Sequence, residues 1–193
     1  MSHSLSRHDQ ILRAGIEANA GRVFKTVGDA FCAAFASPEA ALDACLAVQA
    51  GLAAETWRIE GGILVRMAIH SGEAEERDED YFGPALNRVA RLLSLAYGGQ
   101  ILLSLATEEL LVDRLPKGVS LRLLGRYRLK DLSRPETVYQ VEAPGLHSDF
   151  PPIKSLDGKP HNLPLEPTPF IGREAEVATI VQAFSDPDCR LLS

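Results

Sequence analysis

Two strand-like segments separated by only two residues place the strongest constraint on how this chain folds. Arg22–Val27 and Ala30–Phe35 are short apolar and β-branched runs, and only Gly28-Asp29 lies between them. Glycine in the first position of a two-residue loop is typical of a type II′ hairpin turn. A hairpin this tight makes its strands antiparallel neighbours, so the sequence predicts an antiparallel pair near the N-terminus.

Helical segments flank this hairpin. Apolar residues at helical spacing predict a helix over His8–Ala20, which Gly21 ends. After the hairpin, Ser37 is a suitable N-cap and Pro38 fits the first helical position. The alanine-rich run that follows predicts a second helix reaching about Trp57.

Residues 64–141 continue the alternation of strands and helices. We expect a strand over Leu64–His70, an acidic loop over Glu73–Asp80, a helix opened by Gly83-Pro84 and ended by Gly98-Gly99, a strand over Gln100–Ser104, a helix over Ala106–Leu115, and strands over Val119–Leu129 and Thr137–Val141. Strand pairs interleaved with helices indicate an α+β sandwich with a mainly antiparallel sheet.

Composition sets limits on what the protein can bind. The 193 residues include 46% hydrophobic residues and carry a net charge of −6, which indicates a folded domain and argues against a nucleic-acid or anionic membrane surface as partner. No apolar run approaches the roughly 18 residues of a membrane helix, and Met1–Gln10 lacks the apolar core of a signal peptide. Cys32, Cys45 and Cys189 are widely spaced, which favours free thiols in a reducing cytoplasm.

Proline divides the chain into three parts. Residues 143–169 contain seven prolines and are typical of an extended linker. The chain therefore divides into a domain over residues 1–142, this linker, and a segment over residues 170–193 in which a helical pattern resumes.

Three motifs are candidates for binding chemistry, each beside a plainer interpretation. Asp29 at the tip of a tight hairpin would be exposed and firmly held, as a magnesium ligand must be, although Asp is also a common turn residue. Asn87 and Arg91 lie four residues apart and share a helix face that could hold a ribose and a phosphate, or simply be solvated. Lys130 follows a predicted strand and could attract a phosphate, although such a lysine is usually just exposed.

Two other polar features receive weaker interpretations. The acidic loop Glu73–Asp80 lacks the ligand spacing and mid-loop glycine of an EF-hand, which favours a solvated loop over a calcium site. His70, at the end of a predicted strand, is assigned no role beyond orienting the next turn.

Taken together, these motifs resemble class III adenylate and guanylate cyclase catalytic domains. Four segments match that family's blocks in the correct order over about residues 8–142, and these are Phe24–Phe31, Val65–Glu73, Asp80–Arg91 and Arg128–Lys130. The resemblance implies a ferredoxin-like α+β fold that works as a head-to-tail homodimer with active sites at its interface. It also implies Mg²⁺ or Mn²⁺ as cofactor, with Asp29 as a metal ligand.

The resemblance also assigns the substrate and the residues that contact it. Lys25 and Asp80 would contact the base, with Asp78 as an alternative to Asp80. Because aspartate accepts and lysine donates a hydrogen bond, this pair favours ATP over GTP, so the implied reaction yields cyclic AMP and pyrophosphate.

The remaining assignments concern the ribose and the phosphates. On the opposite protomer, Asn87 would orient the ribose and Arg91 would stabilise the α-phosphoryl transition state, while Lys130 would hold the terminal phosphates.

One departure from the family pattern concerns the metal. The family's first strand carries a second metal-binding aspartate and should precede the helix over His8–Ala20, but Met1–Arg7 contains no acid. We therefore expect a cyclase fold lacking its first strand, with impaired turnover, and we expect the coding DNA upstream of Met1 to encode that strand. Two alternatives are a regulatory nucleotide-binding module without turnover and a pure interaction module.

The C-terminal segment carries a second resemblance. Pro167–Glu174 resembles the entry to the signalling ATPase modules that often follow such cyclase domains. A downstream ATPase domain is therefore an expected partner of this one, in a cytoplasmic signalling protein.

Overall fold

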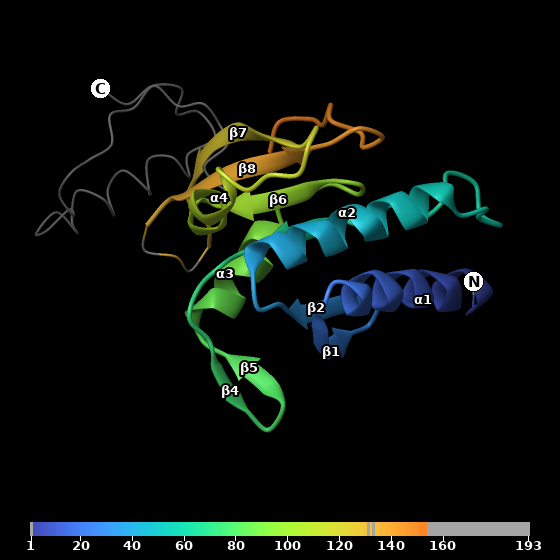
Figure 1. The fold of residues 1–193 in the computed structure, drawn as a ribbon, viewed down its shortest axis with the longest axis horizontal. Helices are drawn as coiled ribbons and strands as arrows, with labels where there is room; N and C mark the ends of the chain where they lie inside the picture. The colour runs from blue at the N-terminus through green and yellow to red at the C-terminus, as the bar shows by residue number, and fades with distance from the viewer. Residues whose placement is uncertain (1, 131, 133, 154–193) are drawn as a thin grey trace, which may run out of the picture. The chain divides into compact units, whose positions relative to one another are not determined.

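The structure is a computed structural model that describes residues 2–130, 132 and 134–153, and Figure 1 shows its fold. Its helices are α1 (Ser2–Ala18), α2 (Pro38–Ala54), α3 (Pro84–Leu93) and α4 (Leu105–Leu111). Its strands are β1 (Arg22–Val27), β2 (Ala30–Ala34), β3 (Met67–Ile69), β4 (Glu75–Arg77), β5 (Asp80–Phe82), β6 (Ile101–Ser104), β7 (Ser120–Tyr127) and β8 (Glu136–Glu142). The predicted α+β class is confirmed.

The strands form one four-stranded sheet and two separate hairpins. The four-stranded sheet has the order β3-β6-β8-β7, in which β3 and β6 are parallel and the other pairs are antiparallel. The hairpins β1–β2 and β4–β5 each form a two-stranded antiparallel sheet. The mainly antiparallel character predicted from the sequence is therefore confirmed, and the two-residue loop after β1 forms as expected.

Strand β6 is buried along its whole length and sends side chains into two cores. On one face, Ile101 and Leu103 pack in a cluster with Leu42 of α2 and Leu111 of α4. On the other face, Leu102 packs against Leu92 of α3 together with Val138. Helices therefore cover both faces of the sheet, with α2 and α4 in one core and α3 in the other.

The two long helices lie side by side, as Figure 1 shows in the blue and cyan part of the chain. Leu12 of α1 packs against Val48 and Leu52 of α2 in a third core cluster. Gly15 permits a very close approach, because a Cβ atom added there would lie 2.4 Å from Cγ2 of Val48. The absence of a side chain at Gly15 therefore sets the spacing of these helices.

Helix α1 begins at Ser2, so the prediction that it starts at His8 is wrong. Ser4 and His8 are 8% and 4% exposed, and they precede the buried Leu12 and Ile16 at intervals of four residues. These four side chains form one buried stripe along the helix. Because the stripe continues N-terminal to His8, the helix extends to Ser2. Polar residues at two of the four positions conceal the stripe in the sequence.

The acidic segment predicted as a loop is also different. Glu75–Arg77 and Asp80–Phe82 pair as the hairpin β4–β5, which projects away from the four-stranded sheet in Figure 1. Its two turn residues, Asp78 and Glu79, have φ angles of 49° and 64°, as a type I′ turn requires. Glycine or asparagine usually marks a two-residue hairpin turn in a sequence, and this turn contains neither. The sequence therefore did not indicate the hairpin.

Several element boundaries also differ from the predictions. Strand β3 is shorter than Leu64–His70, and α3 ends at Leu93 rather than at Gly98-Gly99. The Ser37 cap is confirmed, since its hydroxyl accepts a hydrogen bond from the backbone nitrogen of Ala40 at 3.2 Å.

None of the helices in the described part of the chain has the length and apolarity that crossing a membrane requires.

Two of the predicted free thiols lie in the described residues. Cys32 and Cys45 are unpaired, and burial raises the pKa of the Cys45 thiol to about 12. Such a thiol stays protonated and chemically inert at neutral pH. Cys189 lies outside the described residues.

The first part of the predicted proline-rich linker contacts the domain. The backbone oxygen of Ser148 accepts a hydrogen bond from Nε2 of Gln140 at 2.8 Å, and that of Pro152 accepts one from the Tyr97 hydroxyl at 3.0 Å. The ring of Phe150 also stacks on Tyr97. Residues 143–153 are therefore held on the domain. The rest of the predicted linker, 154–169, and the predicted ATPase segment, 170–193, lie outside the described residues.

The Gly15 contact gives a test of the helix packing. We expect Gly15→Ala to destabilise the domain by about 1–3 kcal/mol, because overpacking outweighs the roughly 1 kcal/mol gain in helix propensity. Chemical unfolding measures the change. In a Val48→Ala background the same substitution should cost less, because the clashing methyl group is gone. An increase in stability for Gly15→Ala alone would contradict the close approach.

Candidate active site

The candidate site centres on an ion pair that joins the two hairpins. Nζ of Lys25 on β1 donates a hydrogen bond to Oδ2 of Asp80 on β5 at 2.6 Å. The two residues are far apart in the sequence and lie in different two-stranded sheets. The structure therefore brings together the two residues that the sequence analysis selected for base contact. Asp78, the alternative to Asp80, lies in the turn of the β4–β5 hairpin.

Further contacts fix the position of β1 against the β4–β5 hairpin. Nη2 of Arg22 donates to Oε1 of Glu76 at 2.6 Å, and the Arg22 guanidinium lies 5.2 Å from the ring centroid of Tyr81. The ring of Phe24 meets the same tyrosine edge to face, with centroids 5.0 Å apart. Aromatic and cation–π contacts of this kind add specificity to the ion pairs. Lys25 and Asp80 are thus held within a larger contact between the hairpins.

The charges of this pair stabilise each other. The hydrogen bond to Asp80 raises the pKa of Lys25, and the same hydrogen bond lowers the pKa of Asp80. Both side chains are therefore ionised at neutral pH. One exposed surface thus offers a strong donor beside a strong acceptor, the combination that recognises the hydrogen-bonding edge of a purine.

Only Gly83 lies between β5 and helix α3, which carries the next two predicted site residues. Gly83, with a φ of 132°, allows the chain to turn from the strand into the helix, and Pro84 occupies the first turn. Asn87 is exposed and Arg91 is half-buried. Since Arg91 follows Asn87 by four positions, the helix places both on one face, as predicted.

The other two predicted residues are exposed. Asp29 lies at the tip of the β1–β2 hairpin, where Gly28 has a φ of 63°, and Lys130 lies in a turn beyond β7. Within residues 2–130, 132 and 134–153, no three His, Cys, Asp or Glu side chains gather as metal ligands do. Asp29 is a single exposed carboxylate at this hairpin tip.

A buried polar network beside α3 was missed in the sequence. Nδ1 of His70 lies 2.7 Å from Oγ of Ser104, and that hydroxyl lies 3.2 Å from Oγ1 of Thr107. Ser104 and Thr107 are fully buried, and Oγ1 of Thr107 also lies 3.2 Å from the Ser71 hydroxyl. His70 was assigned only an orienting role. Its partners lie more than thirty residues away, so no local pattern could have indicated them.

Arg88 and Glu136 were missed as well. Nη1 of Arg88 on α3 donates to Oε2 of Glu136 on β8 at 2.8 Å. Glu136 is 5% exposed. A buried carboxylate needs such a partner, but the sequence alone does not reveal its burial.

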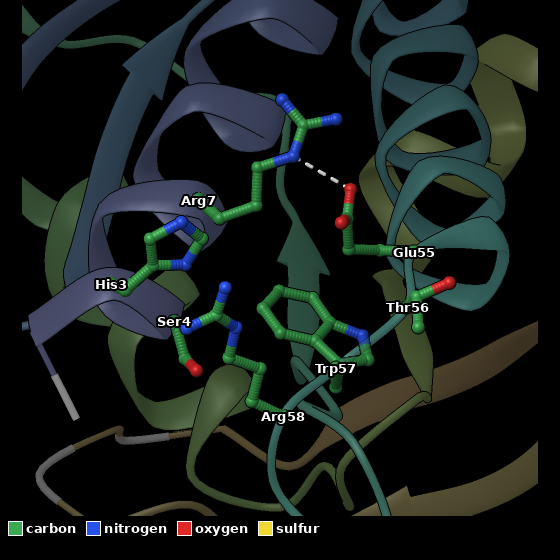
Figure 2. Close-up of a pocket in the computed structure, with 7 residues that line it drawn as sticks. All are labelled: His3, Ser4, Arg7, Glu55, Thr56, Trp57 and Arg58. Atoms are coloured by element: carbon green, nitrogen blue, oxygen red, sulfur yellow. Dashed lines mark hydrogen bonds and ion pairs between the residues drawn. The ribbon is translucent and has the colours of Figure 1, made fainter.

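A small cleft lies elsewhere, between the start of α1 and the end of α2, as Figure 2 shows. Nε of Arg7 donates to Oε2 of Glu55 across it at 2.6 Å, and Trp57 donates to the backbone oxygen of Leu52. The cleft has room for only about 30 Å³, whereas small-molecule sites usually measure about 300–1,000 Å³. The cleft is therefore too small for a nucleotide. The Arg7–Glu55 contact across it connects the start of α1 to the end of α2.

The surroundings of His70 predict a pH dependence of stability. Burial and then the charge of Arg88 lower the pKa of His70, while Glu136 opposes the shift. Below about pH 6.5 the unfolded chain takes up a proton at this position before the folded chain does, so stability falls as the pH drops toward the lower folded pKa. We expect His70→Gln to reduce the slope of unfolding free energy between about pH 6.5 and 5.

The control for this prediction is His3→Gln, because His3 is exposed on α1. Urea unfolding at a series of pH values gives both slopes. Equal slopes for wild type and His70→Gln would contradict a depressed His70 pKa.

Relatives of the chain include both uncharacterized proteins and cyclases. The chain is 41% identical over 152 residues to an uncharacterized protein of Mycobacterium tuberculosis, a match that covers 78% of this chain and 51% of that protein. It is 38% identical over 129 residues to an adenylate cyclase of Mycosarcoma maydis, covering 54% of this chain and 5% of the cyclase. The chain thus spans about half the length, or less, of these curated relatives.

Solved cyclase structures share the fold. An adenylate cyclase of Trypanosoma brucei, analysed in its monomeric state, superposes with a TM-score of 0.70 and 25% identity, covering 81% of this chain and 84% of that one. An adenylate/guanylate cyclase/hydrolase from Silicibacter pomeroyi superposes with a TM-score of 0.61 and 30% identity, covering 69% and 79%. The architecture described above is therefore that of cyclase catalytic domains.

A family profile covers most of the chain. The profile of the adenylate and guanylate cyclase catalytic domain matches residues 1–143, which include β1 to β8 and all four helices described here. The ordered motifs, the sheet topology and this match agree with one another. The chain belongs to the adenylate and guanylate cyclase catalytic domain family.

Proposed function

We propose that this chain is a nucleotide cyclase domain that converts ATP to cyclic AMP and pyrophosphate in intracellular signalling. The observation that supports this most directly is the 2.6 Å contact between Lys25 and Asp80. Two residues assigned to the base on the strength of motif resemblance meet in space although they belong to separate hairpins.

The proposed preference for ATP follows from hydrogen-bond complementarity. Adenine donates from its N6 amino group and accepts at N1, so Asp80 would accept from N6 and Lys25 would donate to N1. Without a nucleotide, the two side chains satisfy each other. Both are partly exposed, so the exchange of partners does not require the core to open.

The proposed chemistry at the phosphates involves α3 and the turn after β7. The 3′-hydroxyl of ATP loses its proton to solvent and attacks the α-phosphorus. The bond from that phosphorus to the α–β bridging oxygen breaks, and pyrophosphate leaves with that oxygen. Arg91 would oppose the negative charge that builds up in the transition state, and Asn87 would orient the ribose. Lys130 would hold the terminal phosphates. A second copy of the chain would present Asn87 and Arg91, which makes the active species a homodimer.

Cyclase domains of this family are generally metal-dependent, and Asp29 would supply one carboxylate to Mg²⁺ or Mn²⁺. The described residues contain no group of three His, Cys, Asp or Glu side chains that could hold a metal ion. The same observation favours a second candidate function, a nucleotide-binding regulatory domain that has no turnover by itself.

The surrounding architecture is part of the proposal. Residues 1–142 would form the cyclase domain, the proline-rich segment to residue 169 would be the linker, and residues 170–193 would begin an ATPase module. In such an arrangement, a domain that makes cyclic AMP in the cytoplasm would be followed by an ATPase domain in the same chain.

We expect the base-contact pair to determine nucleotide preference. Wild type should bind ATP more tightly than GTP, and the double variant Lys25→Glu with Asp80→Cys should weaken or reverse that order. Loss of one charge-assisted hydrogen bond costs about 1.5–3 kcal/mol, which corresponds to about 10–150-fold in affinity. Isothermal titration with both nucleotides measures the change.

A matched control is the double variant Arg114→Glu with Glu39→Cys. Arg114 and Glu39 form a similar ion pair at 2.8 Å, outside the proposed site. This control should leave the order of ATP and GTP unchanged. Equal affinities of the wild type for the two nucleotides would refute the base-contact assignment.

Turnover distinguishes the two candidate functions. With Mn²⁺ and ATP, a cyclase should release cyclic AMP, and Asp29→Ala should abolish that release because it removes the carboxylate ligand. ATP binding without cyclic AMP would favour the regulatory function. Turnover that survives Asp29→Ala would show that Asp29 is not a metal ligand.

A further inference from the structure

One buried carboxylate connects the sheet to two helices. Glu136 is the first residue of β8 and is 5% exposed. Its Oε2 accepts a hydrogen bond from Nη1 of Arg88 on α3 at 2.8 Å, and its Oε1 accepts one from the backbone nitrogen of Leu105, the first residue of α4, at 3.3 Å. Each oxygen therefore contacts a different helix.

The physical chemistry of this site makes the Arg88 contact strong. A carboxylate withdrawn from water is unfavourable unless a cation and hydrogen-bond donors replace its hydration. The start of α4 offers a backbone N–H and the positive end of a helix dipole, and Arg88 offers the full charge. The Arg88 side chain is 39% exposed, so its aliphatic part crosses from the surface to the buried carboxylate.

The position of Arg88 on α3 links this contact to the proposed catalytic residues. Arg88 directly follows Asn87 and precedes Arg91 by three residues. At 3.6 residues per turn, its side chain lies about 100° around the helix from Asn87 and about 60° from Arg91. Fixing the direction of Arg88 therefore fixes the directions of both neighbours.

Apolar contacts hold α3 near each of its ends. Leu92 is fully buried against Leu102 and Val138, but it lies one turn after Arg88, close to the end of the helix. In the first turn, Ala85 contributes only a methyl group beside Gly72. The Arg88–Glu136 ion pair supplies a directional contact between these two points.

We propose that Glu136, acting through Arg88, is a positioning residue that sets the rotation of α3 and thereby the placement of Asn87 and Arg91. The catalytic consequence rests on the proposed cyclase function. How firmly α3 is held is a property of the fold and can be measured without turnover.

The first measurement is hydrogen exchange of the α3 amides by mass spectrometry on the whole chain. Glu136→Gln keeps an acceptor for the Leu105 nitrogen but removes the charge that holds Arg88. We expect exchange in α3 to rise by about tenfold or more, with α2 unchanged. The control is Glu142→Gln on the same strand, which removes the more exposed ion pair with Arg122 at 3.1 Å and should leave α3 unchanged.

A double-mutant cycle tests whether Glu136 acts through Arg88. Arg88→Gln should loosen α3 as Glu136→Gln does, and the double variant should loosen it no further. Arg88→Lys, which keeps a positive charge, should restore part of the protection. Additive effects, or unchanged exchange in Glu136→Gln, would overturn the proposal. If Glu136→Gln fails to fold, the half-exposed Arg88 variants still decide the question.

Steady-state kinetics separates this proposal from the proposed function. If the chain makes cyclic AMP, Glu136→Gln should lower kcat by about tenfold or more with little change in KM, because the base still binds at Lys25 and Asp80. A loosened α3 with unchanged kcat would overturn the catalytic consequence. If wild type makes no cyclic AMP, the proposed cyclase function fails, while the exchange data still decide whether Glu136 holds α3.

Discussion

Strand β6 places both helix layers of this domain, because side chains from each of its faces are withdrawn from water. Ile101 and Leu103 face the core that contains α2 and α4, while Leu102 faces the core that contains α3. Each of these side chains is at most 1% exposed, and burying such a residue stabilises a fold by about 1.5–3 kcal/mol. The two layers therefore depend on one short strand. The Arg88–Glu136 ion pair adds a polar contact in the middle of α3.

The candidate site is assembled from parts that the central sheet does not hold directly. Neither the β1–β2 hairpin nor the β4–β5 hairpin pairs with the four-stranded sheet, so Lys25 and Asp80 meet through side-chain contacts. Strand β5 leads through Gly83 into α3, which places the proposed base contact and the proposed catalytic helix on one short stretch of chain.

Local patterns predicted much of this fold, while contacts between distant residues escaped them. The glycine-first loop after β1, the Ser37 cap and the Gly83-Pro84 entry to α3 are local signals, and all three form. The start of α1 was hidden because Ser4 and His8 occupy buried positions in the same stripe as Leu12 and Ile16. The β4–β5 hairpin was hidden because its left-handed turn residues are Asp78 and Glu79.

The candidate site shows the same division. Motif resemblance selected Lys25 and Asp80, which meet in the structure. It missed Arg88 and Glu136, which are 48 residues apart and have no spacing that a single sequence reveals. The burial of Glu136 comes from the packing of β8 against two helices, and only the folded chain shows it.

A crystal structure of this chain with a non-hydrolysable ATP analogue would test base recognition most directly. The adenine N6 amino group should lie about 2.7–3.2 Å from a carboxylate oxygen of Asp80, with Nζ of Lys25 at a similar distance from N1. The direct contact between Lys25 and Asp80 should then lengthen beyond 2.6 Å. An adenine bound elsewhere, with the Lys25–Asp80 contact unchanged, would show that this pair does not recognise the base.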